Sequence, residues 1–181
     1  MQHAAFLAEK LGFGVTDAVI KALEDAGFNN QTAQEVMIQS TNSSVLSKFK
    51  RQTSYKLVYM VDETISNADA SSLSDIKKFA SSVAVSKKSI YPVSEAFITG
   101  QTDLVKNLQS AGLSVFVYVL RNEYLSQPWD FFSDPTVEIN SFVQGTGVDG
   151  IITEFPGTVT QYKSTYHSDI LTYFSSHGMF R

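Results

Sequence analysis

Short apolar runs alternate along the chain with segments in which apolar residues recur at helical spacing. The runs are rich in β-branched and aromatic residues and are bounded by polar or turn residues; they cover residues 36–39, 57–61, 82–85, 113–120 and 148–153. Such runs predict buried strands. The segments with helical spacing cover residues 44–52, 71–80, 102–111 and 137–143. This alternation predicts parallel strands joined by right-handed crossovers, and therefore an α/β fold.

Three glycines mark the expected ends of helices. Gly27, Gly112 and Gly145 each follow a segment with helical spacing and each precede a predicted strand. Glycine is favoured there because it adopts the left-handed turn that ends a helix without steric cost. At the start of the helix that ends near Gly27, Thr16 and Asp17 are predicted to cap the first turn.

The spacing of the predicted strands suits βα units but not a complete barrel. The strands start roughly 20 to 35 residues apart, and a whole eight-stranded (β/α) barrel takes about 250 residues. This chain has 181 residues, and residues 4–12 are predicted to form a helix with no strand before it. Two alternatives remain: a smaller open sheet, or a chain that begins partway through a barrel. The opening helix favours the second.

Composition and charge exclude several kinds of partner. The chain is 43% hydrophobic, has a net charge of -4 and contains no cysteine, so disulfides and thiolate metal sites are excluded. No Lys/Arg cluster is interleaved with aromatic residues, so no nucleic-acid partner is expected. Lys48, Lys50 and Arg51 are interpreted as a solvated helix end. No apolar run approaches the ~20 residues that span a bilayer, and no secretory signal pattern is seen in the chain.

Polar residues follow each predicted strand, at the end where parallel α/β folds carry their functional groups. They are Gln39 and Ser40, Asp62 and Glu63, Lys87 and Lys88, Arg121, Asn122 and Glu123, and finally Glu154. Strand ends also carry polar residues simply because loops are solvated, and for any single one of these residues that interpretation is favoured.

Histidines and aromatic residues give weaker signals. His3, His167 and His177 have no metal-ligand spacing. The aromatic residues after the fourth predicted strand could form a pocket wall, although loop packing is the favoured interpretation. They are Tyr124, Trp129, Phe131 and Phe132.

Long motifs in the second half of the chain resemble one family. The stretch VFVYVLRNEYLSQPWDFFSDPTVEINSFVQGTGVDGIITEFPGT is similar to the closing segment of plant glycerophosphodiester phosphodiesterase-like proteins, with its VYVYLFRNE, QPWDFFSD and GVDGIITDFPGT patterns. Upstream, EVMIQSTNSSVL, LVYMVDE, KKFASSVAVSKKSIYPVSEAF and VKNLQSAGL resemble earlier parts of the same domain. We therefore predict that residues 1–163 form the C-terminal part of such a domain and that residues 164–181 are a divergent tail.

The resemblance implies a fold and an activity. The fold is an incomplete TIM (β/α)8 barrel of the phospholipase C-like type, with the C-terminal strands only and the N-terminal half missing. The activity is that of a hydrolase of lipid and glycerol metabolism, which cleaves glycerophosphodiesters to sn-glycerol 3-phosphate and an alcohol. A divalent cation, Ca²⁺ or Mg²⁺, is expected as cofactor, and a glycerophosphodiester as small-molecule partner. The implied location is the plant cell wall, the extracellular space or the plasma-membrane surface.

Most of the catalytic groups that the resemblance implies are absent from this sequence. The family uses a His-Arg-Gly motif, a Glu-x-Asp pair and a second histidine, and none of these occurs at suitable spacing. Gln2 stands at the position of a family glutamate, where a neutral amide would be a weak metal ligand. Tyr118 and Asn122 correspond to a Trp-Thr-Val-Asn pattern, and Glu154 to the acidic residue of the last strand, which makes these three the predicted substrate-binding residues.

Three functional hypotheses remain open. The first is a fragment of an active phosphodiesterase that is itself inactive. The second is a non-catalytic domain in cell-wall or cell-surface organisation, with a degenerate site. The third is a five-stranded open-sheet domain that binds a small ligand at its strand ends.

Overall fold

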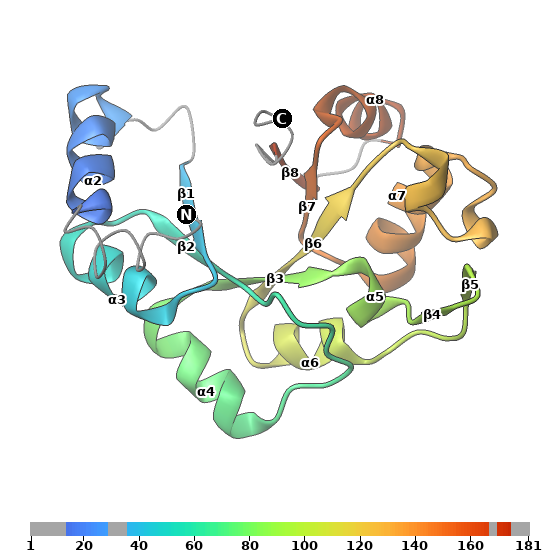
Figure 1. The fold of residues 1–181 in the computed structure, drawn as a ribbon, viewed down its shortest axis with the longest axis horizontal. Coiled ribbons are helices and arrows are strands. Elements are labelled where there is room, and N and C mark those ends of the chain that lie inside the picture. The colour runs from blue at the N-terminus through green and yellow to red at the C-terminus, as the bar shows by residue number, and fades with distance from the viewer. Residues whose placement is uncertain (1–13, 29–35, 167–169, 175–181) are drawn as a thin grey trace. The chain divides into compact units, whose positions relative to one another are not determined.

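The fold is that of a computed structural model, which describes residues 14–28, 36–166 and 170–174 of the 181-residue chain (Figure 1). The described residues fall into two compact units. The first runs up to Met60 and includes Ala70–Val83, and the second consists of Val61–Asp69 and the chain from Ala84 onward. Each unit is described by itself.

Within its described residues, the first unit packs three helices with two parallel strands. The strands are β1 (Met37–Ser40) and β2 (Lys56–Met60), in register from Met37↔Lys56 to Ser40↔Tyr59. The helices are α2 (Val15–Asp25), α3 (Ser43–Gln52) and α4 (Ala70–Phe79). The buried core of this unit consists of Ile20, Ile38, Val45, Leu46, Phe49, Leu57 and Ala80. These residues come from both strands, from the apolar faces of α2 and α3, and from Ala80 just after α4, whose Ile76 and Phe79 pack against them while partly buried. Burial of these apolar side chains holds the layers together.

The second unit is built on parallel strands in the order β3, β6, β7, β8 (Figure 1). These strands are β3 (Ser82–Ser86), which begins in the first unit, β6 (Ser114–Leu120), β7 (Gly150–Thr153) and β8 (Leu171–Phe174). β7 pairs in parallel with both β6 and β8. Gly150 is required in β7, because a Cβ atom there would collide with the ring of Phe116 on β6.

Helices and one hairpin complete the second unit. The α-helices are α5 (Lys87–Ile90), α6 (Leu104–Ser110), α7 (Pro135–Asn140) and α8 (Pro156–Tyr166). Two 3₁₀ turns, η2 (Tyr124–Ser126) and η3 (Trp129–Phe131), follow β6, and a π-helix, η4 (Ser141–Thr146), continues α7. The short strands β4 (Val93–Ser94) and β5 (Phe97–Ile98) form an antiparallel hairpin.

The five predicted strands and the four predicted helices are confirmed, with bounds that differ by a few residues. The hairpin, α8 and β8 were not predicted. β8 is short and lies within residues 164–181, which carry no family motif, and its pairing with β7 shows only in the tertiary structure. The helix predicted over residues 4–12 lies outside the described residues.

Two predictions about helix ends were wrong. Gly145 does not end the fourth predicted helix, because the π-helix continues to Thr146 and Gly147 takes the left-handed conformation (φ 73°). Thr16 and Asp17 do not cap α2, because Gly14 precedes the helix and both residues lie inside its first turn. The carboxylate of Asp17 instead pairs with Lys48 on α3 at 2.7 Å.

Candidate functional site

The carboxyl ends of β6 and β7 lie next to each other. Leu120 and Thr153 are partners in the parallel register, and the Thr153 hydroxyl donates to the Leu120 carbonyl at 2.9 Å. The amide of Glu154 donates to the same carbonyl at 3.3 Å. The residues that follow the two strands therefore emerge side by side, as the predicted βα order requires.

This register brings two of the predicted binding residues to one edge of the sheet. Arg121 donates to the Glu154 carboxylate at 2.6 Å, with side chains 45% and 18% exposed. That hydrogen bond raises the pKa of the guanidinium above its usual value. The amide of Asn122 donates to the Thr158 hydroxyl at 2.8 Å. The edge thus presents a guanidinium, an amide and a carboxylate, which are groups that recognise phosphate and hydroxyl oxygens.

Tyr118, the third predicted binding residue, makes an internal hydrogen bond. It lies on β6, half-buried, and its hydroxyl donates to the carbonyl of Val61. Burial raises the pKa of the phenol, and the charge of nearby Asp62 raises it further. The Tyr118 hydroxyl therefore holds in place the segment that begins at Val61. Because the hydroxyl proton is donated to that carbonyl, it is not available to a ligand.

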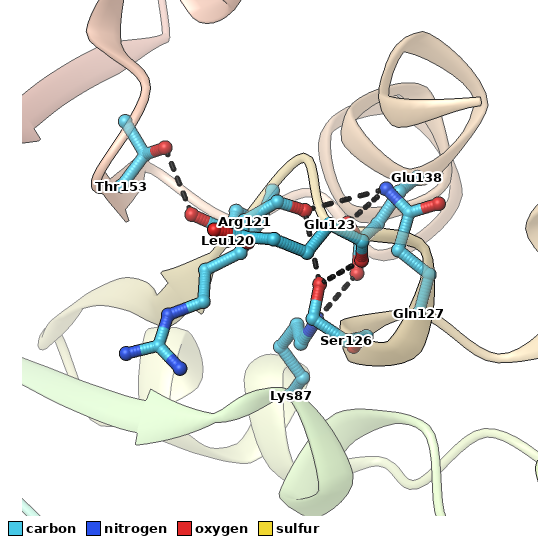
Figure 2. A network of polar contacts seen from close by, with 8 residues as sticks. All are labelled: Lys87, Leu120, Arg121, Glu123, Ser126, Gln127, Glu138 and Thr153. Carbon is cyan, nitrogen blue, oxygen red and sulfur yellow. Dashed lines mark hydrogen bonds and ion pairs between the residues drawn. The ribbon is translucent and has the colours of Figure 1, made fainter. Parts of the chain in front are cut away.

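A buried polar network supports the loop after β6 (Figure 2). Lys87, directly after β3, contacts Glu138 on α7 at 2.7 Å and donates to the Ser126 carbonyl at 2.7 Å. The Gln127 amide donates to the other oxygen of Glu138 at 3.1 Å and to the Arg121 carbonyl at 3.4 Å. Figure 2 shows the Arg121 side chain pointing away from these contacts while its carbonyl faces them.

The Glu138 carboxyl is the most deeply buried charged group of this network. Its side chain is 1% exposed. Burial raises the pKa of Glu138, whereas the charge and hydrogen bonds of Lys87 and the hydrogen bond from Gln127 act in the opposite direction. A carboxylate this deep needs both partners, because an unpaired buried charge costs several kcal/mol. The network therefore ties α5, the loop after β6 and α7 together.

The sequence did not point to Glu138 or Gln127. Glu138 lies within a predicted helix and precedes the buried Phe142 by four residues, so it shares that residue's face of the helix. A carboxylate on an apolar helix face is a signal for a buried ion pair, but nothing in the sequence names Lys87 as its partner.

The remaining strand-end candidates have structural contacts or are exposed. The Ser40 hydroxyl accepts from the backbone N–H of Asn42, and the side-chain amide of Gln39 donates to the sulfur of Met60 at 2.7 Å. Asp62 and Glu63 are exposed. Gln2, the predicted metal ligand, and the three histidines lie outside the described residues.

The aromatic residues after β6 divide into two groups. Phe131 is buried, whereas Trp129 and Phe132 are exposed. The side chain of Tyr124 lies outside the described part of the structure. Loop packing therefore explains Phe131 but not its two exposed neighbours.

The donor set of the described residues does not fit a divalent cation. Among the described residues, no group of three or more His, Asp or Glu side chains could hold a metal ion. Glu154, the acidic residue at the β6–β7 edge, already pairs with Arg121. Within the same residues, no helix is both long and apolar enough to cross a membrane.

Comparison with known proteins identifies the family. Residues 1–158 match the Glycerophosphoryl diester phosphodiesterase family. The chain belongs to this family. The predicted fold class is thereby confirmed: the parallel α/β units are the C-terminal strands of an incomplete (β/α)8 barrel of the phospholipase C-like type.

Plant relatives match across most of the chain. Glycerophosphodiester phosphodiesterase GDPDL1 from Arabidopsis thaliana is 51% identical over 164 residues, which are 90% of this chain and 22% of that protein. Glycerophosphodiester phosphodiesterase GDPDL3 is also 51% identical, over 163 residues and 22% of its length. Protein SUPPRESSOR OF NPR1-1 CONSTITUTIVE 4 is 46% identical over 90% of this chain and 15% of its own length. The chain therefore spans about a fifth or less of these relatives.

Proposed function

We propose that this chain supplies the last strands of a phosphodiesterase that hydrolyses glycerophosphodiesters to sn-glycerol 3-phosphate and an alcohol. The family match over residues 1–158 carries the proposal. The edge formed by Arg121, Asn122 and Glu154 supports it, because functional groups of (β/α) barrels lie at the carboxyl ends of the strands. The small-molecule partner is then a glycerophosphodiester, and the pathway is lipid and glycerol metabolism.

Each residue of this edge has a proposed role. Asn122 donates a hydrogen bond to a glycerol hydroxyl or a phosphate oxygen, in exchange for its contact with Thr158. Glu154 holds the guanidinium of Arg121 in place, so that its remaining N–H groups face a phosphate. Tyr118 contributes its ring as a wall, because its hydroxyl proton is donated to Val61.

The described residues are proposed to be insufficient for turnover. The histidines and metal-binding carboxylates that the resemblance implies are not among them, and their donor set does not fit Ca²⁺ or Mg²⁺. When bound, such a cation would screen the phosphate charge and activate an oxygen. We therefore expect the isolated 181-residue chain to be inactive, and a location at the plant cell wall or plasma-membrane surface stays a proposal.

A non-catalytic role in cell-wall or cell-surface organisation is the second candidate. The observation that favours it is the amide of Gln2 at the position of a family glutamate, since an amide is a weaker cation ligand than a carboxylate. The two candidates differ in whether this segment supports turnover inside a complete barrel.

A chimera tests the proposal. Residues 1–158 replace the matched segment of GDPDL1 from Arabidopsis thaliana, with GDPDL1 itself and the isolated chain assayed beside it. The readout is sn-glycerol 3-phosphate released from glycerophosphocholine with Ca²⁺ or Mg²⁺. We expect turnover by the chimera and none by the isolated chain. Turnover by the isolated chain refutes its inactivity, and a silent but folded chimera beside an active GDPDL1 favours the non-catalytic role.

Substitutions in the chimera test the strand-end residues. Glu154→Gln should lower kcat/KM roughly tenfold or more, because Arg121 loses the carboxylate that orients it. Asp103→Asn removes a carboxylate from an exposed ion pair with Lys106 and is the matched control. Equal kcat/KM in the two variants would remove Glu154 from the proposed site.

A further inference from the structure

A pocket of about 240 Å³ lies beside the buried network of the second unit. Its inner wall is aromatic. The Tyr91 and Phe142 rings have centroids 5.2 Å apart, and each lies 6.3 Å from the ring of Phe131. The Tyr91 hydroxyl donates to the Ser141 carbonyl at 3.0 Å, so its ring is held in place. These contacts make a preformed apolar surface, which is typical of small-molecule sites.

The pocket also contains a lysine ammonium whose position is fixed by hydrogen bonds. Lys87 lines it with its ammonium held by Glu138 and by the Ser126 carbonyl, each at 2.7 Å. An ammonium has three N–H groups, and the third has no partner among the described residues. Lys88, which is exposed, lines the same pocket. With two lysines and one buried carboxylate, the lining carries a net charge of about +1, which favours a monoanion.

Exposed apolar side chains belong to the pocket lining or lie next to it. Leu125, part of the lining, is 92% exposed. The amide of Trp129 donates to the carbonyl of Ala96, another lining residue, at 2.9 Å, and the Trp129 ring packs on Phe97 with centroids 5.4 Å apart. Trp129 is 56% exposed. Large apolar groups exposed together around a hollow are typical of binding sites.

The volume of the pocket limits the size of a ligand that it can enclose. Sites that hold drug-sized ligands typically have ~300–1,000 Å³, so a ligand in this pocket is small or extends past the mouth. The exposed side chains of Leu125 and Trp129 would cover such an extension. A ligand with one anionic group and one alkyl chain matches both features, because its charge meets the lysines and its chain meets the rings.

We propose that this pocket binds a small amphipathic monoanion, whose carboxylate or phosphodiester group contacts Lys87 and Lys88 and whose alkyl chain lies on the aromatic wall and leaves past Leu125. The site is distinct from the edge formed by Arg121, Asn122 and Glu154, and its occupancy does not depend on hydrolysis. A binding experiment can therefore fail or succeed independently of the proposed activity.

Binding can be followed through Trp129, which is the only tryptophan of the chain. The full 181-residue chain is titrated with decanoate, 1-decanoyl-lysophosphatidylglycerol, glycerophosphoglycerol and decanol. The first two combine an anion with a chain, the third has the phosphodiester without the chain, and the fourth has the chain without charge. We expect saturable binding of at least one of the first two, roughly tenfold tighter than of the last two. Which one binds identifies the anionic group.

Substitutions of residues that line the pocket test whether the ligand binds there. Lys88→Glu reverses an exposed charge, and Leu125→Asp places a carboxylate at the mouth, so each should weaken binding roughly tenfold. Both side chains are exposed, so the fold should be kept, which circular dichroism checks. Lys106→Glu makes the same charge change on α6 and is the matched control. The proposal would be overturned if neither decanoate nor 1-decanoyl-lysophosphatidylglycerol binds more tightly than decanol, or if the Lys88 and Lys106 variants have equal affinities for the anionic ligand that binds.

Discussion

Lys87→Met should destabilise the second unit in a pH-dependent way. The substitution keeps most of the alkyl stem but removes the ammonium that contacts Glu138, whose side chain is 1% exposed. Among the described residues, Glu138 then keeps only the neutral Gln127 amide, at 3.1 Å, as hydrogen-bond donor. Breaking a buried ion pair in this way typically costs about 3–5 kcal/mol, because the remaining charge is uncompensated.

Protonation of Glu138 limits that cost and sets its pH dependence. The carboxyl has a reference pKa of 4.5, and burial raises the folded-state pKa above it. The folded protein therefore binds more protons than the unfolded chain between these two values, so stability falls as pH rises through that window. Lys87 opposes the shift in the native protein, so its removal should widen the window. Protonating a group of pKa 4.5 at pH 7 costs about 3.4 kcal/mol, at 1.36 kcal/mol per unit.

We expect Lys87→Met to lower the free energy of unfolding by about 3 kcal/mol at pH 7, with the deficit shrinking by up to about 1.4 kcal/mol per pH unit toward pH 4.5. This loss of unfolding free energy is measured by urea unfolding at several pH values, with Trp129 fluorescence and circular dichroism as the signals. Lys88→Met removes the neighbouring, exposed lysine and should cost about 0.5 kcal/mol or less. Lys87→Met combined with Glu138→Gln should recover most of the loss. A deficit below about 1 kcal/mol at pH 7, or one that does not change with pH, would refute this reasoning.

Two further predictions concern packing in the second unit. Gly150→Ala should cost about 1–3 kcal/mol in urea unfolding, because its Cβ meets the Phe116 ring, whereas Gly157→Ala in α8 meets open space and should gain about 0.5–1 kcal/mol. Equal effects at the two glycines would contradict the packing. Tyr118→Phe leaves the Val61 carbonyl without its donor and should cost about 1–3 kcal/mol, with faster amide exchange in residues 61–69. Unchanged exchange there would show that the hydroxyl does not hold this segment.

The elements that the sequence predicted well are those with a strong local pattern. The runs around Ile38, Val83 and Ile151 are buried strands, because a β-branched run bounded by turn residues has few alternatives in an α/β protein. Gly27 and Gly112 adopt positive φ at helix ends, as their positions indicated. Gly145 was misassigned because Gly147 lies two residues further on, and only the extent of the π-helix distinguishes them.

The placement of two candidate-site residues could also be predicted from the sequence. Asn122 and Glu154 could be placed at one edge from strand order alone, since parallel strands end on the same side of a sheet. Their partners Arg121 and Thr158 depend on side-chain direction and on where α8 begins.

The sequence by itself determined the α/β class, the positions of the main strands and, through its long motifs, the family resemblance. These features depend on local periodicity and on contiguous residues. Only the tertiary structure decided that Lys87 pairs with Glu138, 51 positions away, and that β8 joins β7. Such contacts depend on which surfaces meet after folding, because the stability of an ion pair or of a short strand comes from burial and pairing that no local pattern encodes.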